Sequence, residues 1–379
     1  MTSYRVFWKG PVKQPTGYGE ASRHYVQALR KQGVPVRITQ AGLSSPAGEG
    51  ARKGSGKSVL VYHHPPHSIR LGKARNHYDR LVLNTVWETS RLPRAWVSAI
   101  NRFDAVCVPS RQNQQAFRES GVKVPIYLVP HGVDAARYRT KASPLSLPGV
   151  KGKFVFLSVF TFQHRKNPET LLRAYWEEFR AGDPVVLIIK TSGFGRDDET
   201  SIRRKIEAYR SRLGIRPQDA AKVLVMGQRL SEQGLQALYA RANAFVLPTR
   251  GEGVGLPFLE ALASGVPVIA TGWGGHLDFL HEGNGFLVNH TLQPPSRSMN
   301  SPHALAPRFR GLFAHSGQRW AEPDLAHLRK QMRKAFRSKR LCRAKGARGK
   351  ADMQHWSWDR SGRWLKKAIE LTLAAKRRS

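Results

Sequence analysis

Short apolar runs alternate with amphipathic stretches along this chain of 379 residues, and the alternation occurs in two series. Short apolar runs are typical of strands buried on both faces, whereas apolar residues recurring every three to four positions are typical of helices. A strand, a helix and a second strand form a βαβ unit, whose strands are parallel. The sequence therefore predicts an α/β protein of two Rossmann-like, doubly wound domains.

The first series starts with an apolar run at Tyr4 to Trp8, followed by the turn Gly17-Tyr-Gly19 and a helical stretch from about Glu20 to Gln32. Further predicted strands are Val34–Thr39, Val59–Tyr62, Leu81–Val86, Ala105–Pro109 and Ile126–Val129. Lys, Ser, Pro and Gly dominate residues 140–153, a composition typical of linkers. We expect an N-terminal domain over residues 1–145 and a linker at about 140–153.

The second series occupies a C-terminal domain that we place at residues 154–354. Its predicted strands are Phe154–Phe160, Val185–Lys190, Val223–Met226, Ala244–Pro248 and Pro267–Thr271. Tryptophans and aliphatic residues then recur at helical spacing from Trp356 to Leu373, so residues 355–379 are expected to form a helix that docks back on the N-terminal domain. Ligands of doubly wound domains bind at the carboxyl ends of the strands, so a cleft there is the expected site.

The charge balance is strongly basic. The chain has 63 Lys and Arg against 26 Asp and Glu, a formal net charge of +37, which predicts attraction to nucleic acid, acidic lipid or phosphorylated substrates. Residues 329–350 contain no acidic residue and are expected to form one surface helix with a cationic face. No apolar run reaches the length of a membrane span, the start lacks a signal-peptide core, and Cys107 and Cys342 show no metal or redox spacing. We expect a cytoplasmic protein.

The segment Gly251-Glu-Gly-Val-Gly-Leu-Pro-Phe-Leu-Glu260 lies between a predicted strand and a helix. Pro257 suits the first helical turn, and the glycines before it let backbone amides approach an anion. A phosphate-bearing ligand fits this loop, and Glu252 and Glu260 can accept hydrogen bonds from hydroxyl groups. Either glutamate alone is also explained as a solvated loop charge or a residue favoured by the helix dipole.

Two glutamates separated by seven residues, followed by Gly265-Val-Pro-Val-Ile269, resemble the signature of the retaining glycosyltransferases of family 4, also called glycosyl transferases group 1. Further segments resemble successive markers of this family: Trp87-Glu88-Thr89, Val108-Pro-Ser110, Val129-Pro-His-Gly-Val-Asp134, Arg165-Lys-Asn-Pro168, Trp320-Ala-Glu-Pro-Asp324 and Trp356-Ser-Trp358. The resemblance covers most of the chain. It implies the GT-B architecture and transfer of a hexose from a GDP- or UDP-sugar to a hydroxyl group of a glycan or lipid-linked glycan.

The resemblance also implies roles for individual residues. Glu252 would bind hydroxyls of the donor sugar, and Glu260 would bind the ribose. The amides of Gly253, Val254, Gly255 and Leu256 would complete the donor pocket. The reaction would retain the anomeric configuration and would need neither a metal nor another cofactor.

The departing diphosphate gathers negative charge, so an enzyme without a metal must place cations there. Arg165 and Lys166 match the family's basic pair only in part, because the position that usually holds an Arg, about six residues before the Lys, is Phe160. Either Arg165 or Lys190 would replace it. The alternative is an exposed basic pair in a basic protein.

In the N-terminal domain, Gly17 and Gly19 precede a helix and could bind the donor phosphates, although a structural turn is an equal alternative. His131, His64 and Glu88 are candidates for lining the cleft. The histidines of Tyr62-His-His-Pro-Pro-His67 have no matching cysteine or carboxylate set, so no metal site is expected.

The net charge and two near-matches to known motifs suggest other function classes. Residues 51–58 nearly spell a P-loop but precede a strand, and the Gly17 turn lacks the later acid of a dinucleotide fingerprint. A nucleic-acid-binding protein is the alternative suggested by the charge, although no such motif accompanies it. A related sugar-nucleotide epimerase is a second alternative. The cationic face is also expected to contact anionic membrane, where Arg333, Lys334, Arg337 and Arg340 would be the residues to reverse.

Overall fold

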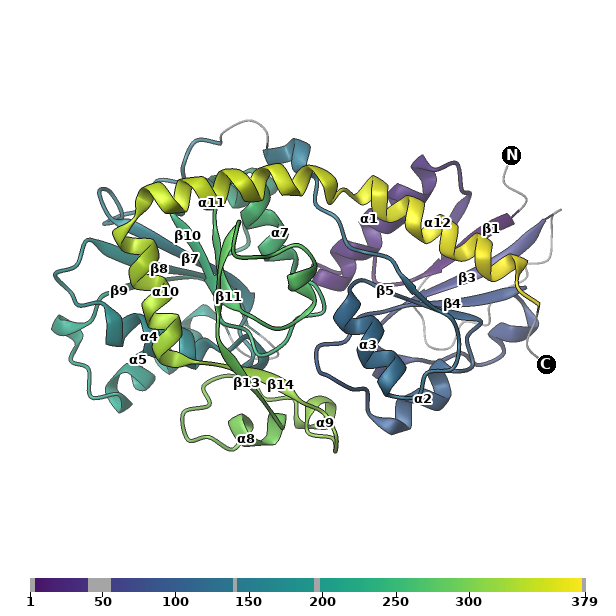
Figure 1. The fold of residues 1–379 in the computed structure, drawn as a ribbon, viewed down its shortest axis with the longest axis horizontal. Coiled ribbons are helices and arrows are strands. Elements are labelled where there is room, and N and C mark those ends of the chain that lie inside the picture. The colour runs from purple at the N-terminus through teal and green to yellow at the C-terminus, as the bar shows by residue number, and fades with distance from the viewer. Residues whose placement is uncertain (1–3, 40–55, 139–141, 194–197, 377–379) are drawn as a thin grey trace. The chain divides into compact units, whose positions relative to one another are not determined.

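The computed structural model describes residues 4–39, 56–138, 142–193 and 198–376, which fold into two α/β units (Figure 1). The first unit comprises residues 1–133 and 355–379, and the second comprises residues 134–354. Each unit is built on a six-stranded sheet in which all neighbouring strands are parallel. The predicted α/β class with two doubly wound domains is confirmed.

The sheet of the first unit has the strand order β2-β1-β3-β4-β5-β6. Its strands are β1 (Tyr4–Lys9), β2 (Val36–Ile38), β3 (Lys57–His63), β4 (Arg80–Asn84), β5 (Ala105–Val108) and β6 (Ile126–Leu128). Its α-helices are α1 (Gly17–Lys31), α2 (Arg94–Ile100), α3 (Arg111–Glu119) and α12 (Trp358–Ala374). The chain winds in opposite directions from β1 and from β3, so the carboxyl ends of these two strands form the topological switch point of this unit.

A side-chain cap and a close backbone contact at Gly19 fix the start of helix α1. The side chain of Thr16 accepts a hydrogen bond from the amide of Gly19 at 3.1 Å. A Cβ atom on Gly19 would lie 1.9 Å from the carbonyl oxygen of Gln14, so only glycine fits this turn. The helix buries one face, which includes Tyr25 and Leu29, against the sheet.

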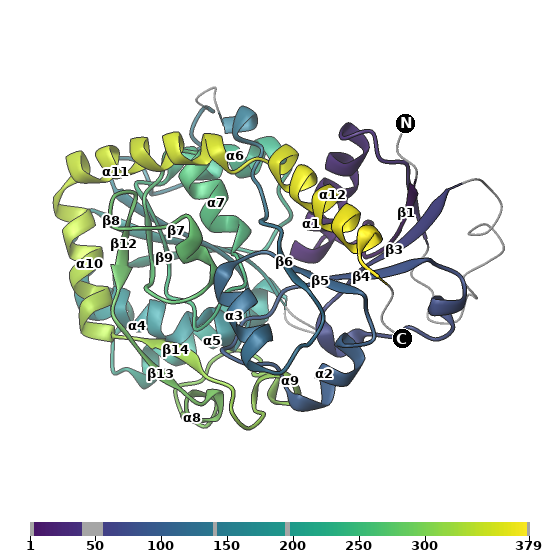
Figure 2. The same cartoon turned by 45° about the vertical axis from the view of Figure 1, so that its right-hand side comes forward.

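Helix α12 belongs to the first unit although it ends the chain, and both views show it alongside α1 (Figures 1 and 2). The ring of Trp358 stacks on His24 with centroids 4.7 Å apart. Arg80 of β4 donates hydrogen bonds to the carbonyl groups of Thr372 and Ala375. The buried face of α12 is therefore fixed by packing at its start and by hydrogen bonds at its end.

The sheet of the second unit has the order β12-β11-β10-β7-β8-β9. Its strands are β7 (Phe154–Thr161), β8 (Val185–Ser192), β9 (Lys222–Met226), β10 (Ala244–Leu247), β11 (Val268–Thr271) and β12 (Gly285–Val288). Its α-helices are α4 (Pro168–Glu178), α5 (Glu199–Arg212), α6 (Glu232–Arg241), α7 (Leu256–Ala263), α8 (Pro295–Met299), α9 (Arg310–Phe313), α10 (Leu325–Arg337) and α11 (Lys339–Asp352). The central strands β10 and β11 are buried along their whole length, as expected for a sheet covered on both faces.

The division between the units falls at residues 133 and 134, before the linker expected at about 140–153. Residues 139–141 lie outside the described part of the chain. The segment that follows is held by the second unit, because the amide of Leu145 donates to Ala237 and Arg241 donates to the carbonyl of Leu145. Its Pro- and Gly-rich composition indicates a lack of regular structure rather than a boundary.

The single surface helix expected over residues 329–350 is wrong, because the structure has two helices there. Ser338 separates α10 from α11, with φ −127° and ψ 81°, and its side chain caps α11 by accepting from the amide of Leu341. A serine hydroxyl competes for backbone hydrogen bonds in this way, which favours a helix start over a helix interior. The helical spacing of apolar residues continues across Ser338, so this sequence pattern could not reveal the break.

A two-stranded antiparallel sheet, β13 (His290–Gln293) with β14 (Trp320–Pro323), has no counterpart among the expected elements. None of the described helices is both long and apolar enough to cross a membrane.

Candidate functional site

The second sheet has its topological switch point between β7 and β10. From β7 the chain proceeds through α4 to β8 on one side, and from β10 it proceeds through α7 to β11 on the other. Ligands of doubly wound sheets bind beyond the carboxyl ends of the strands at such a point. The segments that follow β7, β10 and β11 are therefore the candidate site.

The segment after β7 carries two cations. His164–Lys166 form one turn of 3₁₀ helix, and Asn167 then adopts a left-handed conformation with φ 61° and ψ 51°. Asparagine is one of the few residues other than glycine that tolerate this region. Its side chain accepts a hydrogen bond from the amide of Thr170 at 3.3 Å and caps α4. This sharp turn positions Arg165 and Lys166 immediately before the helix.

Glu252 follows β10 and lies beside both cations. Its Oε1 is 2.5 Å from Nζ of Lys166, and its Oε2 is 3.3 Å from Nη1 of Arg165. The Glu252 side chain is only 5% exposed. Burial alone would raise the pKa of Glu252, but the attraction of Lys166 and Arg165 outweighs it and lowers this pKa to about 2. Glu252 is therefore a carboxylate at neutral pH.

Hydrogen bonds to backbone carbonyl groups join the loops that carry these side chains. The amide of Arg250 donates to the carbonyl of Arg165 at 2.8 Å, and the Thr249 hydroxyl donates to the same carbonyl at 3.1 Å. Arg165 in turn donates from Nη1 to the carbonyl of Gly251 at 2.5 Å. The loops after β7 and β10 are thus joined by three hydrogen bonds.

The glycine loop after Glu252 leaves backbone donors without acceptors. Among the described residues, no acceptor lies within hydrogen-bond distance of the amides of Gly253, Val254 or Gly255. Gly255 has φ +81°, and helix α7 starts directly after it with Pro257 in its first turn. Buried amides are nearly always paired, so these three donors form a site that suits an anion.

His276 enters the site from the loop after β11, and the sequence analysis missed it. The amide of Gly275 donates to the carbonyl of Glu252 at 2.8 Å, and Nε2 of His276 lies 2.8 Å from the carbonyl oxygen of Thr271. Its Nδ1 is buried and has no partner in the described part of the chain. Burial lowers the pKa of His276, so the ring is neutral. The signal that could have found it is Gly274-Gly275-His276, a glycine-rich turn after a strand adjacent to β10.

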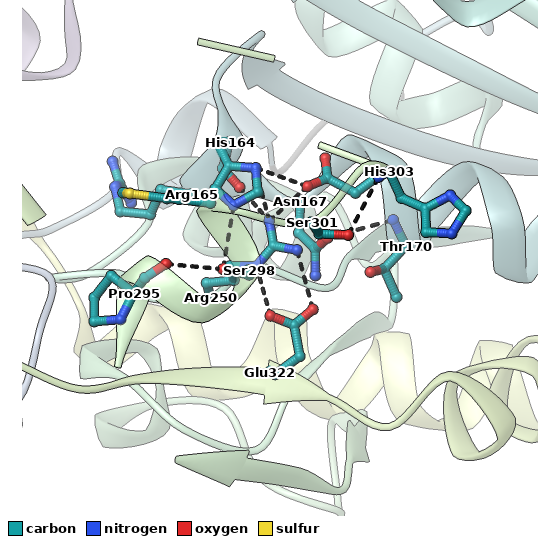
Figure 3. A network of polar contacts seen from close by, with 12 residues as sticks. His164, Arg165, Asn167, Thr170, Arg250, Pro295, Ser298, Ser301, His303 and Glu322 are labelled. Carbon is teal, nitrogen blue, oxygen red and sulfur yellow. Dashed lines mark hydrogen bonds and ion pairs between the residues drawn. The ribbon is translucent and has the colours of Figure 1, made fainter. Parts of the chain in front are cut away.

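A buried ionic cluster lies behind these loops (Figure 3). Arg250 donates to both carboxylate oxygens of Glu322, at 2.7 and 3.0 Å, and lies 2.9 Å from Glu169. Nδ1 of His164 is 2.7 Å from the same Glu169 oxygen, and its Nε2 is 3.2 Å from the hydroxyl of Ser298. Arg250 therefore ties the loop of Glu252 to α4 and to strand β14 of the two-stranded sheet. The sequence analysis missed this cluster as well, because its members are far apart in the chain.

Glu260 and Lys190 do not join the cluster around Glu252. Glu260 accepts a hydrogen bond from the hydroxyl of Tyr239 at 2.7 Å. Burial is the largest cause that raises the pKa values of Tyr239 and Tyr138, and the negative charge of Glu260 is the second. Glu260 therefore lies near both phenol groups. Lys190 is half-buried on β8, burial lowers its pKa, and its Nζ is 3.5 Å from the carbonyl of Thr191. In the described structure Lys190 makes no ion pair with Glu252.

In the first unit, Gly17 and Gly19 occupy the first turn of α1. The amide of Gly19 is already bound to the Thr16 side chain, and the close approach of Gln14 accounts for the glycine. The surroundings of Gly17 are open, with no atom within 4 Å of a Cβ placed there. The structural role given as an alternative therefore explains Gly19, whereas packing alone does not explain Gly17.

The candidate histidines of the first unit are largely buried. The ring of His131 packs edge-on against Tyr25, with centroids 5.6 Å apart, and burial lowers its pKa to about 3. His64 packs against Tyr62 at 4.8 Å, and burial lowers its pKa to about 4. Glu88 is half-buried. Both histidines are therefore neutral at physiological pH.

The remaining histidines of the 62–67 segment do not assemble with one another. His63 is buried and stacks on Trp8 at 5.3 Å, whereas the ring of His67 lies 5.7 Å from Trp96. Across the described residues, no three His, Cys, Asp or Glu side chains are close enough to hold a metal ion.

The comparisons with known proteins match the region that contains this site. A family model described as glycosyl transferases group 1 matches residues 151–298. The lipopolysaccharide core biosynthesis mannosyltransferase LpcC of Rhizobium leguminosarum bv. viciae is 23% identical over 223 residues, 57% of this chain and 59% of that protein. A GDP-mannose-dependent alpha-(1-6)-phosphatidylinositol monomannoside mannosyltransferase of Mycolicibacterium smegmatis is 28% identical over 235 residues, 58% of each chain. The chain spans less than two thirds of the length of both relatives.

The fold was compared with solved structures. A sucrose-phosphate synthase from Thermosynechococcus elongatus superposes with a TM-score of 0.70 at 17% identity, covering 99% of this chain and all of that one. At this identity the match establishes the fold alone, and that fold is GT-B. The matched region 151–298 contains Arg165, Lys166, Glu252 and His276, so the family model, the relatives and the GT-B fold together support a glycosyltransferase of group 1.

Proposed function

We propose that this protein transfers a hexose from a GDP- or UDP-sugar to a hydroxyl group of a glycan or lipid-linked glycan, with retention of configuration and without a metal. The observation that carries the proposal is the contact of Glu252 with Lys166 and Arg165 beside the unpaired amides of residues 253–255. Cations and amide donors at one point suit a diphosphate, and a buried carboxylate next to them suits sugar hydroxyls.

The bond that breaks joins the anomeric carbon to an oxygen of the β-phosphate. As it lengthens, negative charge accumulates on the diphosphate and positive charge on the sugar ring. Lys166, Arg165 and the amides of residues 253–255 would stabilise the diphosphate, because their donors are positioned before the reaction starts. The acceptor hydroxyl would lose its proton to the departing diphosphate as its oxygen bonds to the anomeric carbon.

Glu252 would have two roles. Its carboxylate has more acceptor positions than the two cations use, so it can hold Lys166 and Arg165 in place while accepting a hydrogen bond from a sugar hydroxyl. The buried, unpartnered Nδ1 of His276 supports the same conclusion, since a polar group of a ligand would satisfy it. Glu260 would bind the ribose, with Tyr239 fixing its carboxylate.

The relatives guide the choice of donor. Both reported relatives carry the name mannosyltransferase, and one is named as GDP-mannose-dependent. GDP-mannose is therefore the first donor to test, followed by UDP-glucose.

A cationic surface on α10 and α11, called the basic face, supports the proposal that the acceptor lies at an anionic membrane. We define this face as the exposed residues Lys334, Arg337, Lys339, Arg340 and Arg343 of α10 and α11, which have no ion-pair partner within the described ranges. Arg333, by contrast, lies 2.6 Å from Glu178 of α4 and is unavailable for such a contact. Each basic residue near anionic lipid contributes about 1 kcal/mol, so this face would hold the enzyme at a membrane that carries its acceptor.

The test is transfer from radiolabelled donor by the purified protein, with Glu252→Ala and the isosteric Glu252→Gln measured beside the wild type. We expect both variants to lose transfer while still folding, as checked by circular dichroism. Transfer by Glu252→Ala at the wild-type rate would disprove the assignment.

Two results would favour the alternatives. Interconversion of the donor with its epimer, without an acceptor, would indicate a sugar-nucleotide epimerase. Tight binding of nucleic acid with a steep salt dependence, and no sugar transfer, would indicate a nucleic-acid-binding protein.

A further inference from the structure

A pocket of about 530 Å³ lies at the amino ends of β1 and β2 in the first unit. Its volume falls within the range of small-molecule sites, about 300 to 1,000 Å³. The pocket is lined by Arg5, Arg30 and Arg37 together with the apolar residues Phe7, Val34 and Pro35. Gly17 and Gly19 follow the carboxyl end of β1, and His64 follows that of β3, so this pocket is separate from these candidate positions at the switch point of the first unit.

Strand register brings two of the arginines to the same face of the sheet. Phe7 of β1 pairs with Arg37 of β2, and Arg5 precedes Phe7 by two positions. Side chains two residues apart on a strand share a face, so Arg5, Phe7 and Arg37 project together. Arg30, in the last turn of α1, donates to the carbonyl of Val36 at 3.0 Å and completes the pocket from the helix side.

The charges of this pocket are not balanced by the protein. The Nε and Nη2 atoms of Arg5 are buried and have no acceptor within the described part of the chain. No described acid forms an ion pair with Arg37, and no residue lining the pocket is acidic. Leaving two buried donor atoms of Arg5 without an acceptor is unfavourable, and an anion from outside the chain would satisfy them.

The geometry favours a particular anion. A guanidinium group presents a planar set of N–H donors that matches the oxygens of phosphate and carboxylate groups. Three positive groups favour a dianion over a monoanion, and a phosphate monoester carries a charge of about −1.5 to −2 at neutral pH. Phe7 and Pro35 provide an apolar wall against which the carbon part of the ligand can pack.

We propose that the pocket of Arg5, Arg30 and Arg37 binds a phosphate group, at a site independent of the one proposed for the sugar donor. The phosphate belongs either to a soluble phosphorylated molecule or to a lipid headgroup, and the experiment separates these sources. The proposal does not rest on sugar transfer, since its residues lie in the other unit.

The experiment measures protection of Arg37, which is exposed, from the arginine reagent phenylglyoxal, with mass spectrometry of the peptide that contains it. Inorganic phosphate is titrated into the full-length protein, with chloride at equal ionic strength as the reference. We expect phosphate to slow modification of Arg37 and to leave Arg343 of the basic face unaffected. Because the readout is specific to one residue, phosphate bound at the donor site does not contribute.

Substitutions then test the neighbours. Arg5→Gln and Arg30→Gln should each raise the phosphate concentration that half-protects Arg37 by about tenfold, because a hydrogen bond to a charged group is lost. The matched control Arg343→Gln should change it less than about twofold. Arg30 lies at the end of α1, so Arg30→Gln keeps the test valid if Arg5→Gln fails to fold.

Two arms identify the source of the phosphate. Protection by free phosphate alone supports a soluble ligand, whereas stronger protection by phosphatidic acid vesicles than by phosphatidylcholine vesicles supports a lipid headgroup. Equal protection by phosphate and chloride, without protection by phosphatidic acid vesicles, would overturn the proposal. So would phosphate protection that is unchanged in both Arg5→Gln and Arg30→Gln.

Discussion

Lys166 and Glu252 are 86 positions apart in the chain, yet Nζ of Lys166 lies 2.5 Å from Oε1 of Glu252. The contact joins the segment after β7 to the segment after β10, the two strands that flank the switch point of the second sheet. Glu252 keeps its negative charge because of this contact, and Lys166 is held where a diphosphate would bind.

Removal of the lysine charge should weaken nucleotide binding. We expect Lys166→Met to raise the Kd of GDP or UDP by about tenfold or more, since a charge-assisted hydrogen bond is lost. The measurement is a thermal-shift titration, because a ligand that binds the folded form raises its Tm. Lys330→Met, at an exposed position of α10, is the control. Equal affinity of Lys166→Met and wild type would place the diphosphate elsewhere.

Removal of the guanidinium group of Arg250 should destabilise the second unit. Glu169 is buried and Glu322 is partly buried, so Arg250→Met leaves two carboxylates without their guanidinium partner, at a cost of about 3 to 5 kcal/mol. Arg329 pairs with Glu177 in a more exposed setting, and Arg329→Met should cost less than about 1 kcal/mol. Urea unfolding of both variants measures the difference. Similar losses in the two variants would show that burial does not strengthen the Arg250 cluster.

Gly255 is constrained both by its backbone and by its surroundings. Its φ is +81°, and a Cβ atom there would lie 2.5 Å from the ring of Phe258. Gly214 has φ +70° with open space around it. Gly214→Ala therefore measures only the cost of holding an alanine in the left-handed backbone conformation, about 1 to 2 kcal/mol. We expect Gly255→Ala to lower the free energy of unfolding by about 1 to 3 kcal/mol more than that, because the ring must move. Equal losses would mean that Phe258 moves aside without cost.

Stability should depend on pH through His131. Its pKa is lowered from 6.5 to about 3 by burial, so below pH 6.5 the unfolded chain takes up a proton that the folded chain does not. The unfolded state then binds more protons, and stability falls as pH falls, by up to about 1.4 kcal/mol per pH unit. Urea unfolding between pH 7 and 5 measures this slope. This pH range lies above the one in which Glu252 titrates in the folded protein. In His131→Asn the slope should decrease, and an unchanged slope would assign it to other groups.

The basic face should control binding to anionic membrane. Reversing the charges of Lys334, Arg337, Arg340 and Arg343 to Glu should release the protein from vesicles that contain phosphatidylserine, as measured by co-sedimentation. A control with four exposed cations of the first unit reversed, Lys13, Lys57, Lys73 and Arg94, separates a local effect from that of net charge. Equal release by both variants would show that only the overall charge matters.

The order of elements could be read from the sequence because strands buried on both faces and amphipathic helices have different periodicities. The runs at 154–160 and 244–248 predicted β7 and β10, and the glycines after Glu252 indicated an anion site at the start of α7. The double-glutamate loop also carried the resemblance to the glycosyl transferases group 1. The roles given to Glu252, Glu260 and the basic pair stay predictions.

Other features depended on contacts between distant segments. The break at Ser338 was hidden because both helices continue the same apolar periodicity. The two-stranded sheet of β13 and β14 was not predicted. Arg250 looked like one basic residue among 63, and its burial between Glu169 and Glu322 became visible only in the folded chain. His276 likewise gave no signal of its own beyond the glycines before it.

The amino-acid sequence by itself determined the alternation of strands and helices, the family resemblance and the loop of Glu252, because these depend on residues that are neighbours in the chain. Only the tertiary structure decided which charges meet. A hydrogen bond or ion pair requires atoms within about 3 to 4 Å of each other, and the folding of the sheets brings together segments separated by tens of residues.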